Sequence, residues 1–165
     1  MTTLLIGLGN PILGDDGIGW RVVQAVAAAL PAHAAVEVDY LALGGLSLME
    51  RLVGYRRAII VDSLHTRTGR VGQVHVFNLD TLPDLSTGHT TAAHDTSLQT
   101  ALALGRRMGA PLPQEVLVVG VEAERVYDFS DELSAEVAAA IPAACAAVLE
   151  LLPARSSVAA VKGKE

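Results

Sequence analysis

Short apolar runs alternate with longer stretches of helical periodicity, and this alternation constrains the fold more than any other feature of the sequence. The runs are rich in Val, Ile and Leu and carry few charges, which is typical of strands covered by helices on both faces. Strand–helix–strand alternation predicts an α/β fold with a mostly parallel sheet. The five predicted strands are Thr3–Leu8, Val36–Leu41, Arg57–Val61, Gln73–Phe77 and Val116–Val121.

Helical patterns fill the intervals between most of these strands. They cover about Asp16–Leu30, Leu46–Val53, Thr96–Met108 and Ser134–Leu152. The first pattern stops at Pro31 and the third at Gly109, both of which are helix-ending signals, and Pro142 predicts a kink in the last. We expect a single domain over residues 1–153 and a disordered tail over 154–165, because the tail is small and polar.

The connection between the third and fourth predicted strands is too short for a helix and contains Gly69 and Gly72. The fourth strand is therefore predicted to run antiparallel. Ligands of open α/β sheets bind beyond the carboxyl ends of the parallel strands. The predicted topology brings the loop 9–16, Asp62 and the helix start near His94 to this one edge.

Charge and cysteine content exclude several classes of protein. Twelve Lys and Arg residues against 18 Asp and Glu give a net charge of −6, and the two lysines lie near the end of the chain, so no basic surface for nucleic acid or anionic membrane is expected. The single cysteine, Cys145, excludes an internal disulfide and a multi-cysteine metal site. No segment is predicted to span or insert into a membrane or to act as a signal peptide, and we expect a cytoplasmic protein.

The glycine-rich segment 7–19 differs from a dinucleotide-binding fingerprint. Ile12 stands where the third glycine is needed, and Pro11 disturbs the tight start of the helix. Two carboxylates, Asp15 and Asp16, follow where a pyrophosphate requires backbone N–H groups. The segment therefore argues against a nucleotide-binding oxidoreductase, which we keep as a distant alternative.

The adjacent pair Asp15 and Asp16 has two interpretations. One carboxylate is explained as a helix N-cap, and the other remains as a candidate functional group. Gly17 and Gly19 weaken the first helical turn, which suggests that something approaches the backbone closely there. Asp62 ends the apolar run of the third strand and is a second candidate functional carboxylate.

Three of the five histidines, His65, His89 and His94, are predicted near the same edge, whereas His33 is expected to be exposed and His75 structural. His94 precedes a helix-start pattern, and a helix N-terminus favours the neutral imidazole that binds metals. Two carboxylates with one histidine suit a borderline divalent ion with open coordination positions. Nucleophiles are poorly supported, because Ser47 lacks the flanking pattern of a nucleophile elbow and Cys145 lies in an apolar helix.

The chain resembles the maturation endopeptidases of NiFe hydrogenases from about Thr3 to Leu152. The motifs that carry the resemblance are Gly-Leu-Gly-Asn at 7–10, the run Asp15-Asp16-Gly17-Ile18-Gly19, Ile-Ile-Val-Asp at 59–62, His94 and Val-Gly-Val-Glu at 119–122. The resemblance implies a three-layer α/β/α sandwich with a five-stranded sheet whose fourth strand is antiparallel. It also implies an endopeptidase that removes a C-terminal peptide from a hydrogenase large-subunit precursor after nickel insertion.

In this family the metal-binding and catalytic positions fall on Asp16, Asp62 and His94. The nickel is expected to arrive with the precursor, and the protein is expected to act as a monomer. The ion either polarises the scissile carbonyl or activates water, as in a metallo-type protease, or serves only for recognition while a carboxylate acts as base. A non-enzymatic nickel-binding checkpoint or carrier is the alternative function.

Overall fold

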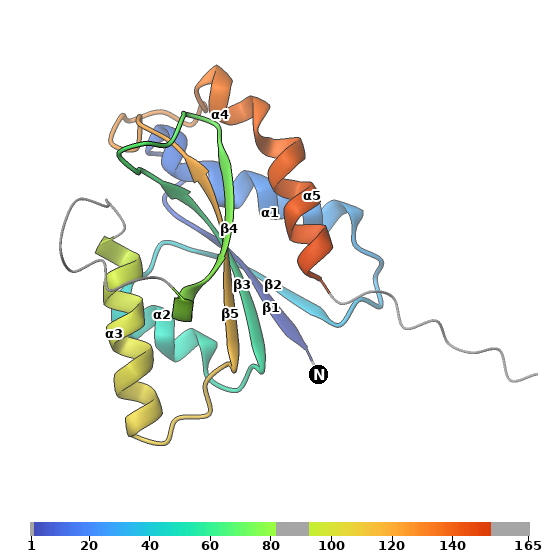
Figure 1. Ribbon diagram of the computed structural model, residues 1–165. Coiled ribbons are helices and arrows are strands. Elements are labelled where there is room, and N and C mark those ends of the chain that lie inside the picture. Colours follow the sequence, from blue (N-terminus) through green and yellow to red (C-terminus); the bar gives the residue numbers. More distant parts are fainter. Residues whose placement is uncertain (1, 82–92, 153–165) are drawn as a thin grey trace, which may run out of the picture.

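A five-stranded mixed sheet forms the centre of the protein, for which the computed structural model describes residues 2–81 and 93–152, without the side chains of residues 93–97. The strands are β1 (Thr3–Leu8), β2 (Val36–Leu41), β3 (Arg57–Leu64), β4 (Val74–Asn78) and β5 (Glu115–Glu122). They lie in the order β2-β1-β3-β5-β4 (Figure 1). All neighbours are parallel except β4, which is antiparallel to β5. The predicted direction of the fourth strand is therefore confirmed.

Helices cover both faces of this sheet. They are α1 (Ile18–Ala29), α2 (Gly45–Leu52), α3 (Ala93–Arg107), α4 (Ala135–Ala139) and α5 (Ile141–Leu151), with short 3-10 turns η1 (Gly14–Gly17) and η2 (Leu79–Thr81). Helices α1, α4 and α5 pack on one face, and α2 and α3 pack on the other (Figure 1). The fold is the predicted three-layer α/β/α sandwich. Within the described ranges, no helix has the length and apolarity needed to cross a bilayer.

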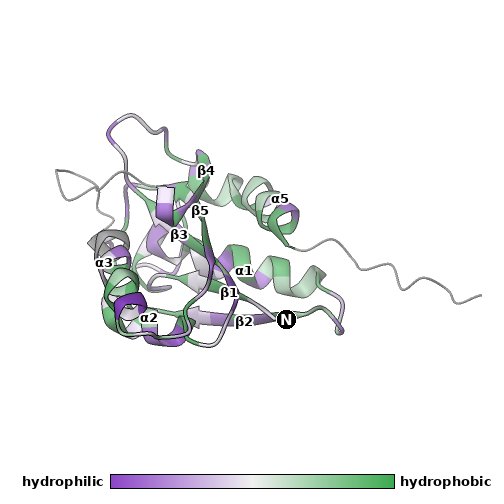
Figure 2. Cartoon of the chain, turned by 60° about the horizontal axis from the view of Figure 1, so that its bottom comes forward, coloured by the Kyte–Doolittle hydropathy of each residue, from purple (hydrophilic) through white to green (hydrophobic). Residues whose placement is uncertain are grey.

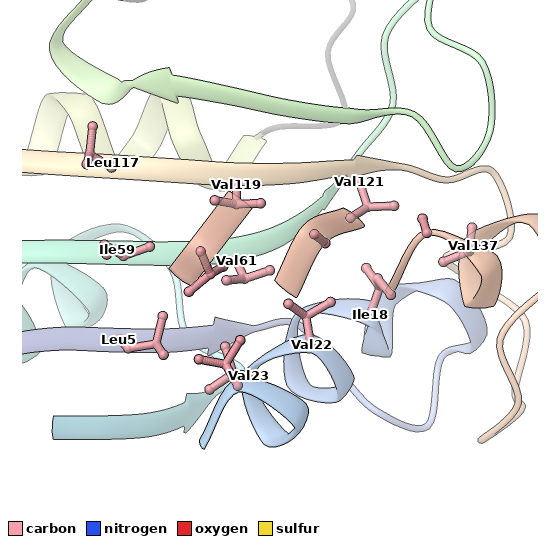
Figure 3. Packing of buried hydrophobic residues seen from close by; sticks show 14 of the residues in the cluster. Leu5, Ile18, Val22, Val23, Ile59, Val61, Leu117, Val119, Val121 and Val137 are labelled. Atoms are coloured by element: carbon pink, nitrogen blue, oxygen red, sulfur yellow. The ribbon is translucent and has the colours of Figure 1, made fainter. Parts of the chain in front are cut away.

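Alternation of side chains along the strands creates two separate cores. Strand residues such as Leu5 and Val61 face Val22 and Val23 of α1 (Figure 3), and α1 and α5 are coloured mainly as hydrophobic in Figure 2. The alternate strand residues pack against α2 and α3; they are Leu4, Ile6, Leu8, Ala58, Ile60, Val116 and Val118. Both faces of the central strands are thus buried, which explains their apolar sequences.

Strand β3 is longer than predicted and continues past Val61 to Leu64. Asp62 and Ser63 interrupt the apolar run, but their backbones still pair with Gly120 and Val121 of β5. Asp62 therefore lies inside a strand, not beyond its end as the apolar pattern alone had suggested.

The last helical segment is two helices, not one kinked helix. Helix α4 ends at Ala139, and α5 begins at Ile141 with Pro142 in its first turn. Proline is favoured there because the first N–H groups of a helix have no intrahelical acceptor. Pro142 therefore starts a new helix. The tail 154–165 lies outside the described residues.

The glycines of the first helical turn are explained by the protein's own backbone. A Cβ on Gly19 would lie 2.3 Å from the carbonyl oxygen of Val61 and 2.4 Å from that of Leu8. A Cβ on Gly17 would lie 3.1 Å from the Cα of Pro11. The close approach expected from the sequence is therefore the packing of α1 directly onto β1 and β3.

Gly19→Ala is expected to lower the free energy of unfolding by about 2–3 kcal/mol, because the added methyl group meets two backbone carbonyls that cannot rotate away. Ala25→Gly, at an exposed position of the same helix, is the matched control, with an expected loss of about 1 kcal/mol from helix propensity. Urea denaturation measures both. Equal losses in the two variants would contradict the packing argument.

Candidate functional site

Asp15 and Asp16 are adjacent in η1 but contact different parts of the protein. Asp15 is only 1% exposed. Its Oδ1 accepts the backbone N–H of Ser134 at 2.7 Å, and its Oδ2 accepts the Ser134 hydroxyl at 2.9 Å. Ser134 is the residue before α4, so Asp15 fixes the start of that helix. Asp15 is therefore a structural residue.

Asp16 joins the loop after β1 to strand β3. Its Oδ2 accepts the backbone N–H of Asn10 at 2.7 Å, and its Oδ1 accepts the Ser63 hydroxyl at 3.1 Å. Gly9, with a φ of +123°, permits the loop to close over Asp16, because a Cβ there would lie 2.1 Å from the Asp16 carbonyl oxygen. Neither Asp15 nor Asp16 caps its own helix through the side chain, so the N-cap interpretation is wrong for both.

Asp62 lies on β3 and is 7% exposed. Its Oδ1 accepts the backbone N–H of Ser63 at 2.8 Å. Ser63 therefore donates to both carboxylates, through its N–H to Asp62 and through its hydroxyl to Asp16. Sequence reasoning missed Ser63, although its position directly after Asp62 was a usable signal.

His94 lies in the first turn of α3, and its side chain is outside the described part of the structure. The segment after α3 is hydrogen-bonded to the residues around the start of β3, where Gly54 N–H contacts Pro111 O and Gln114 N–H contacts Arg56 O. Helix α3 thus ends at the amino edge of the sheet, and its first turn lies toward the carboxyl edge (Figure 1). This backbone placement is on the α2/α3 face, which Asp62 shares with Ile60.

The structure thus links Asp16 to Asp62 through Ser63, whereas the side chain of the third predicted ligand, His94, lies outside the described part. Among the side chains that the structure describes, no group of three His, Cys, Asp or Glu residues is arranged to hold a metal. His89 lies outside the described residues. His33 is exposed, as predicted.

Two other histidines contact the end of β5. His65 Nδ1 lies 3.2 Å from the carbonyl oxygen of Ala123, and His75 Nε2 lies 3.1 Å from Oε1 of Glu122. Glu122 is 2% exposed and also accepts the N–H and hydroxyl of Thr66. These contacts tie the β3–β4 connection and β4 to β5, which agrees with the structural role expected for His75.

Carboxylates on β2 belong to a separate network. Arg51 of α2 donates to Asp39 at 2.6 Å, to Glu37 at 2.8 Å and to the Tyr55 hydroxyl at 3.0 Å. The hydrogen bonds with Tyr55, Asp39 and Glu37 raise the pKa of Arg51 above its usual range. Asp39 and Glu37 therefore join β2 to α2.

The structure also shows the surroundings of the two alternative sites considered from the sequence, a nucleotide site in the loop after β1 and a nucleophile at Cys145. The Asn10 N–H, which a bound pyrophosphate would need, is donated to Asp16. Cys145 packs against the core on the α1/α5 face, its Sγ lies 3.7 Å from the Val22 carbonyl oxygen, and burial raises the pKa of its thiol. Neither a nucleotide site nor a cysteine nucleophile is supported.

Comparison with known proteins gives consistent matches. A family model described as hydrogenase maturation protease matches residues 20–151. The chain is 28% identical over 159 residues to the hydrogenase expression/formation protein HoxM of Azotobacter vinelandii, which covers 96% of this chain and 76% of the relative. It is 27% identical to the hydrogenase 2 maturation protease of Escherichia coli over 121 residues, 73% of each chain. The solved structure of the E. coli hydrogenase maturating endopeptidase HybD superposes with a TM-score of 0.73 at 28% identity, covering 92% of this chain and 91% of that one.

Proposed function

Because the chain belongs to the hydrogenase maturation protease family and is a peptidase, we propose that it removes the C-terminal extension of a NiFe hydrogenase large-subunit precursor after nickel insertion. The carboxylates of Asp16 and Asp62 support this proposal. The observation that carries the proposal is the link from Asp16 through Ser63 to Asp62 at the carboxyl edge of the sheet. This edge is where open α/β sheets bind their ligands. The family match disfavours the alternative of a non-enzymatic nickel carrier.

The donor chemistry of the pair supports contact with a substrate-borne nickel ion. A carboxylate has about four lone-pair positions, and each oxygen of Asp16 accepts one hydrogen bond from the described residues. Asp16 therefore retains the capacity to bind a cation while Asn10 and Ser63 hold its orientation. Together with Asp62 and His94 it would form a mixed oxygen and nitrogen set, which suits a borderline divalent ion.

In this proposal nickel bound to the precursor is the recognition element. Asp16, Asp62 and His94 would hold the ion, which would supply Lewis-acid chemistry there by polarising a carbonyl or acidifying water. The chain's own contribution is to fix two carboxylates at one edge. Either both bind the ion, or one of them stays free of it and acts as general base for the attacking water. All of these residues come from one chain, so a monomer suffices for the proposed reaction. The proposed location is the cytoplasm, because its reducing conditions keep the precursor's thiols available for nickel binding.

Nickel-loaded precursor is expected to be shortened, whereas nickel-free precursor is expected to react at least roughly 100-fold more slowly, which corresponds to about 2.7 kcal/mol of lost interaction. A gel mobility assay with the purified protein and both forms of the precursor measures this. Zinc-loaded precursor is the control for ion identity. Equal cleavage of the nickel-loaded and nickel-free forms would show that the ion is not the recognition element, and binding without shortening would favour the carrier alternative.

A further inference from the structure

The loop after β5, residues 123–134, is joined to the loop that carries Asp16. Leu13 and Ser130 form a parallel β-bridge, and Gly14 N–H donates to Ser130 O at 2.8 Å. Asp15 N–H donates to the Arg125 carbonyl oxygen at 3.0 Å. A Cβ on Gly14, whose φ is +55°, would lie 2.5 Å from that same oxygen. The two loops therefore form one closely packed unit beside the candidate site.

Three large apolar side chains are exposed on this unit. Phe129 is 87% exposed, Tyr127 75% and Ile12 53%. The whole chain has only two Phe, three Tyr and one Trp, so this loop presents a large share of the aromatic residues to solvent. The Ile12 carbonyl oxygen accepts Ser130 N–H at 3.1 Å, which places Ile12 next to the aromatic loop. Single exposed apolar residues are normal on a protein surface, whereas three large ones on one closely packed unit are a candidate interaction surface.

The loop is held in place without a partner. Arg125 Nε donates to Asp128 at 2.9 Å within the loop, and Arg21 of α1 donates to the Asp131 carbonyl oxygen at 2.8 Å. Asp15 fixes the end of the loop through Ser134. A loop ordered in advance loses little conformational entropy on binding, so its aromatic side chains can contribute most of their burial to affinity.

The charges on the loop indicate the character of the partner surface. Four carboxylates lie in the loop, at Glu124, Asp128, Asp131 and Glu132, against the single guanidinium of Arg125, and all five residues are exposed. A matching surface is apolar at its centre and basic at its rim, since complementary charge selects and orients partners.

We propose that Ile12, Tyr127 and Phe129, the aromatic docking surface, bind the folded body of the precursor protein at an apolar patch rimmed by basic side chains. The inference rests on the proposed function, because the precursor is the protein that must contact this edge. Continuity supports it: the unit that presents these side chains also holds Asp16. Binding of the precursor's folded body at this surface does not depend on the metal, and it would position the precursor's C-terminal segment at Asp16 and Asp62.

The test compares the double variant Tyr127→Ser/Phe129→Ser with Met108→Ser, which removes another exposed apolar side chain at the far end of α3. For nickel-loaded precursor, the double variant is expected to raise KM roughly tenfold or more with kcat unchanged at saturation. Met108→Ser is expected to leave both unchanged. Both variants are expected to keep the wild-type melting temperature, because the altered side chains are exposed.

Binding of nickel-free precursor separates this inference from the proposed function. Calorimetry with nickel-free precursor is expected to show that the double variant raises the Kd roughly tenfold and that Met108→Ser leaves the Kd unchanged. Such weakening would support the docking surface even if wild-type protein failed to cleave, which is the failure of the proposed function. An unchanged Kd and KM in the double variant would overturn the inference, as would a wild-type dimer that the double variant converts to monomer with KM unaltered.

Discussion

Asp16→Asn and Asp62→Asn are each expected to lower kcat/KM for nickel-loaded precursor by at least about 100-fold, because both a cation ligand and a general base require the carboxylate charge. Asparagine keeps the size of the side chain and one carbonyl oxygen. At residue 62 this oxygen can accept the Ser63 N–H, and at residue 16 it can accept the Asn10 N–H while the amide donates to the Ser63 hydroxyl. Melting temperatures are therefore expected to stay within a few degrees of wild type. Asp80→Asn, at an exposed ion pair with Arg106, is the control.

Binding measurements on the same variants separate the two roles. A variant that binds nickel-loaded precursor as wild type does but fails to cleave has lost the base, and a variant that also loses binding has lost an ion ligand. Normal cleavage by either variant would remove that residue from the site.

Asp15→Ala is expected to lower the free energy of unfolding by about 3 kcal/mol, because two hydrogen bonds to a buried carboxylate are lost and the Ser134 N–H and hydroxyl lose their acceptor. For a chain of this size the melting temperature should fall by roughly 6–12 °C. Thermal unfolding followed by circular dichroism measures it. The neighbouring Asp16→Asn serves as the control.

Substitution of Asp15 is thus expected to lower stability, whereas substitution of the adjacent Asp16 is expected to lower activity. A stable Asp15→Ala protein would mean that the start of α4 does not depend on this contact. In that case the hydrogen bonds to Ser134 would contribute far less than their burial implies.

Much of the architecture was predictable from local sequence. The apolar runs located every strand. They are clearest in the central strands β1, β3 and β5, because these are buried on both faces. The short connection with Gly69 and Gly72 correctly predicted that β4 is antiparallel, since a parallel crossover needs a longer connection. Asp62 was recognisable as a candidate because a carboxylate that directly follows a buried apolar run at the carboxyl edge of a sheet has few structural explanations.

Local sequence did not reveal which of the two adjacent carboxylates, Asp15 or Asp16, is structural and which is the candidate functional group. Asp15 and Asp16 have the same side chain and the same neighbours in sequence, yet one contacts Ser134 and the other Ser63. The end of β3 was misplaced for a related reason, because its backbone pairing with β5 continues through polar residues that end the apolar pattern.

The sequence by itself therefore determined the layers, the direction of β4 and the edge at which the candidate carboxylates gather, because hydrophobic periodicity and connection length act over a few neighbouring residues. Only the tertiary structure decided that Asp15 anchors α4, that Ser63 bridges Asp16 and Asp62, and that Gly19 admits the backbone of two strands. These outcomes depend on hydrogen-bond partners and van der Waals contacts supplied by residues distant in the chain, which no local pattern encodes.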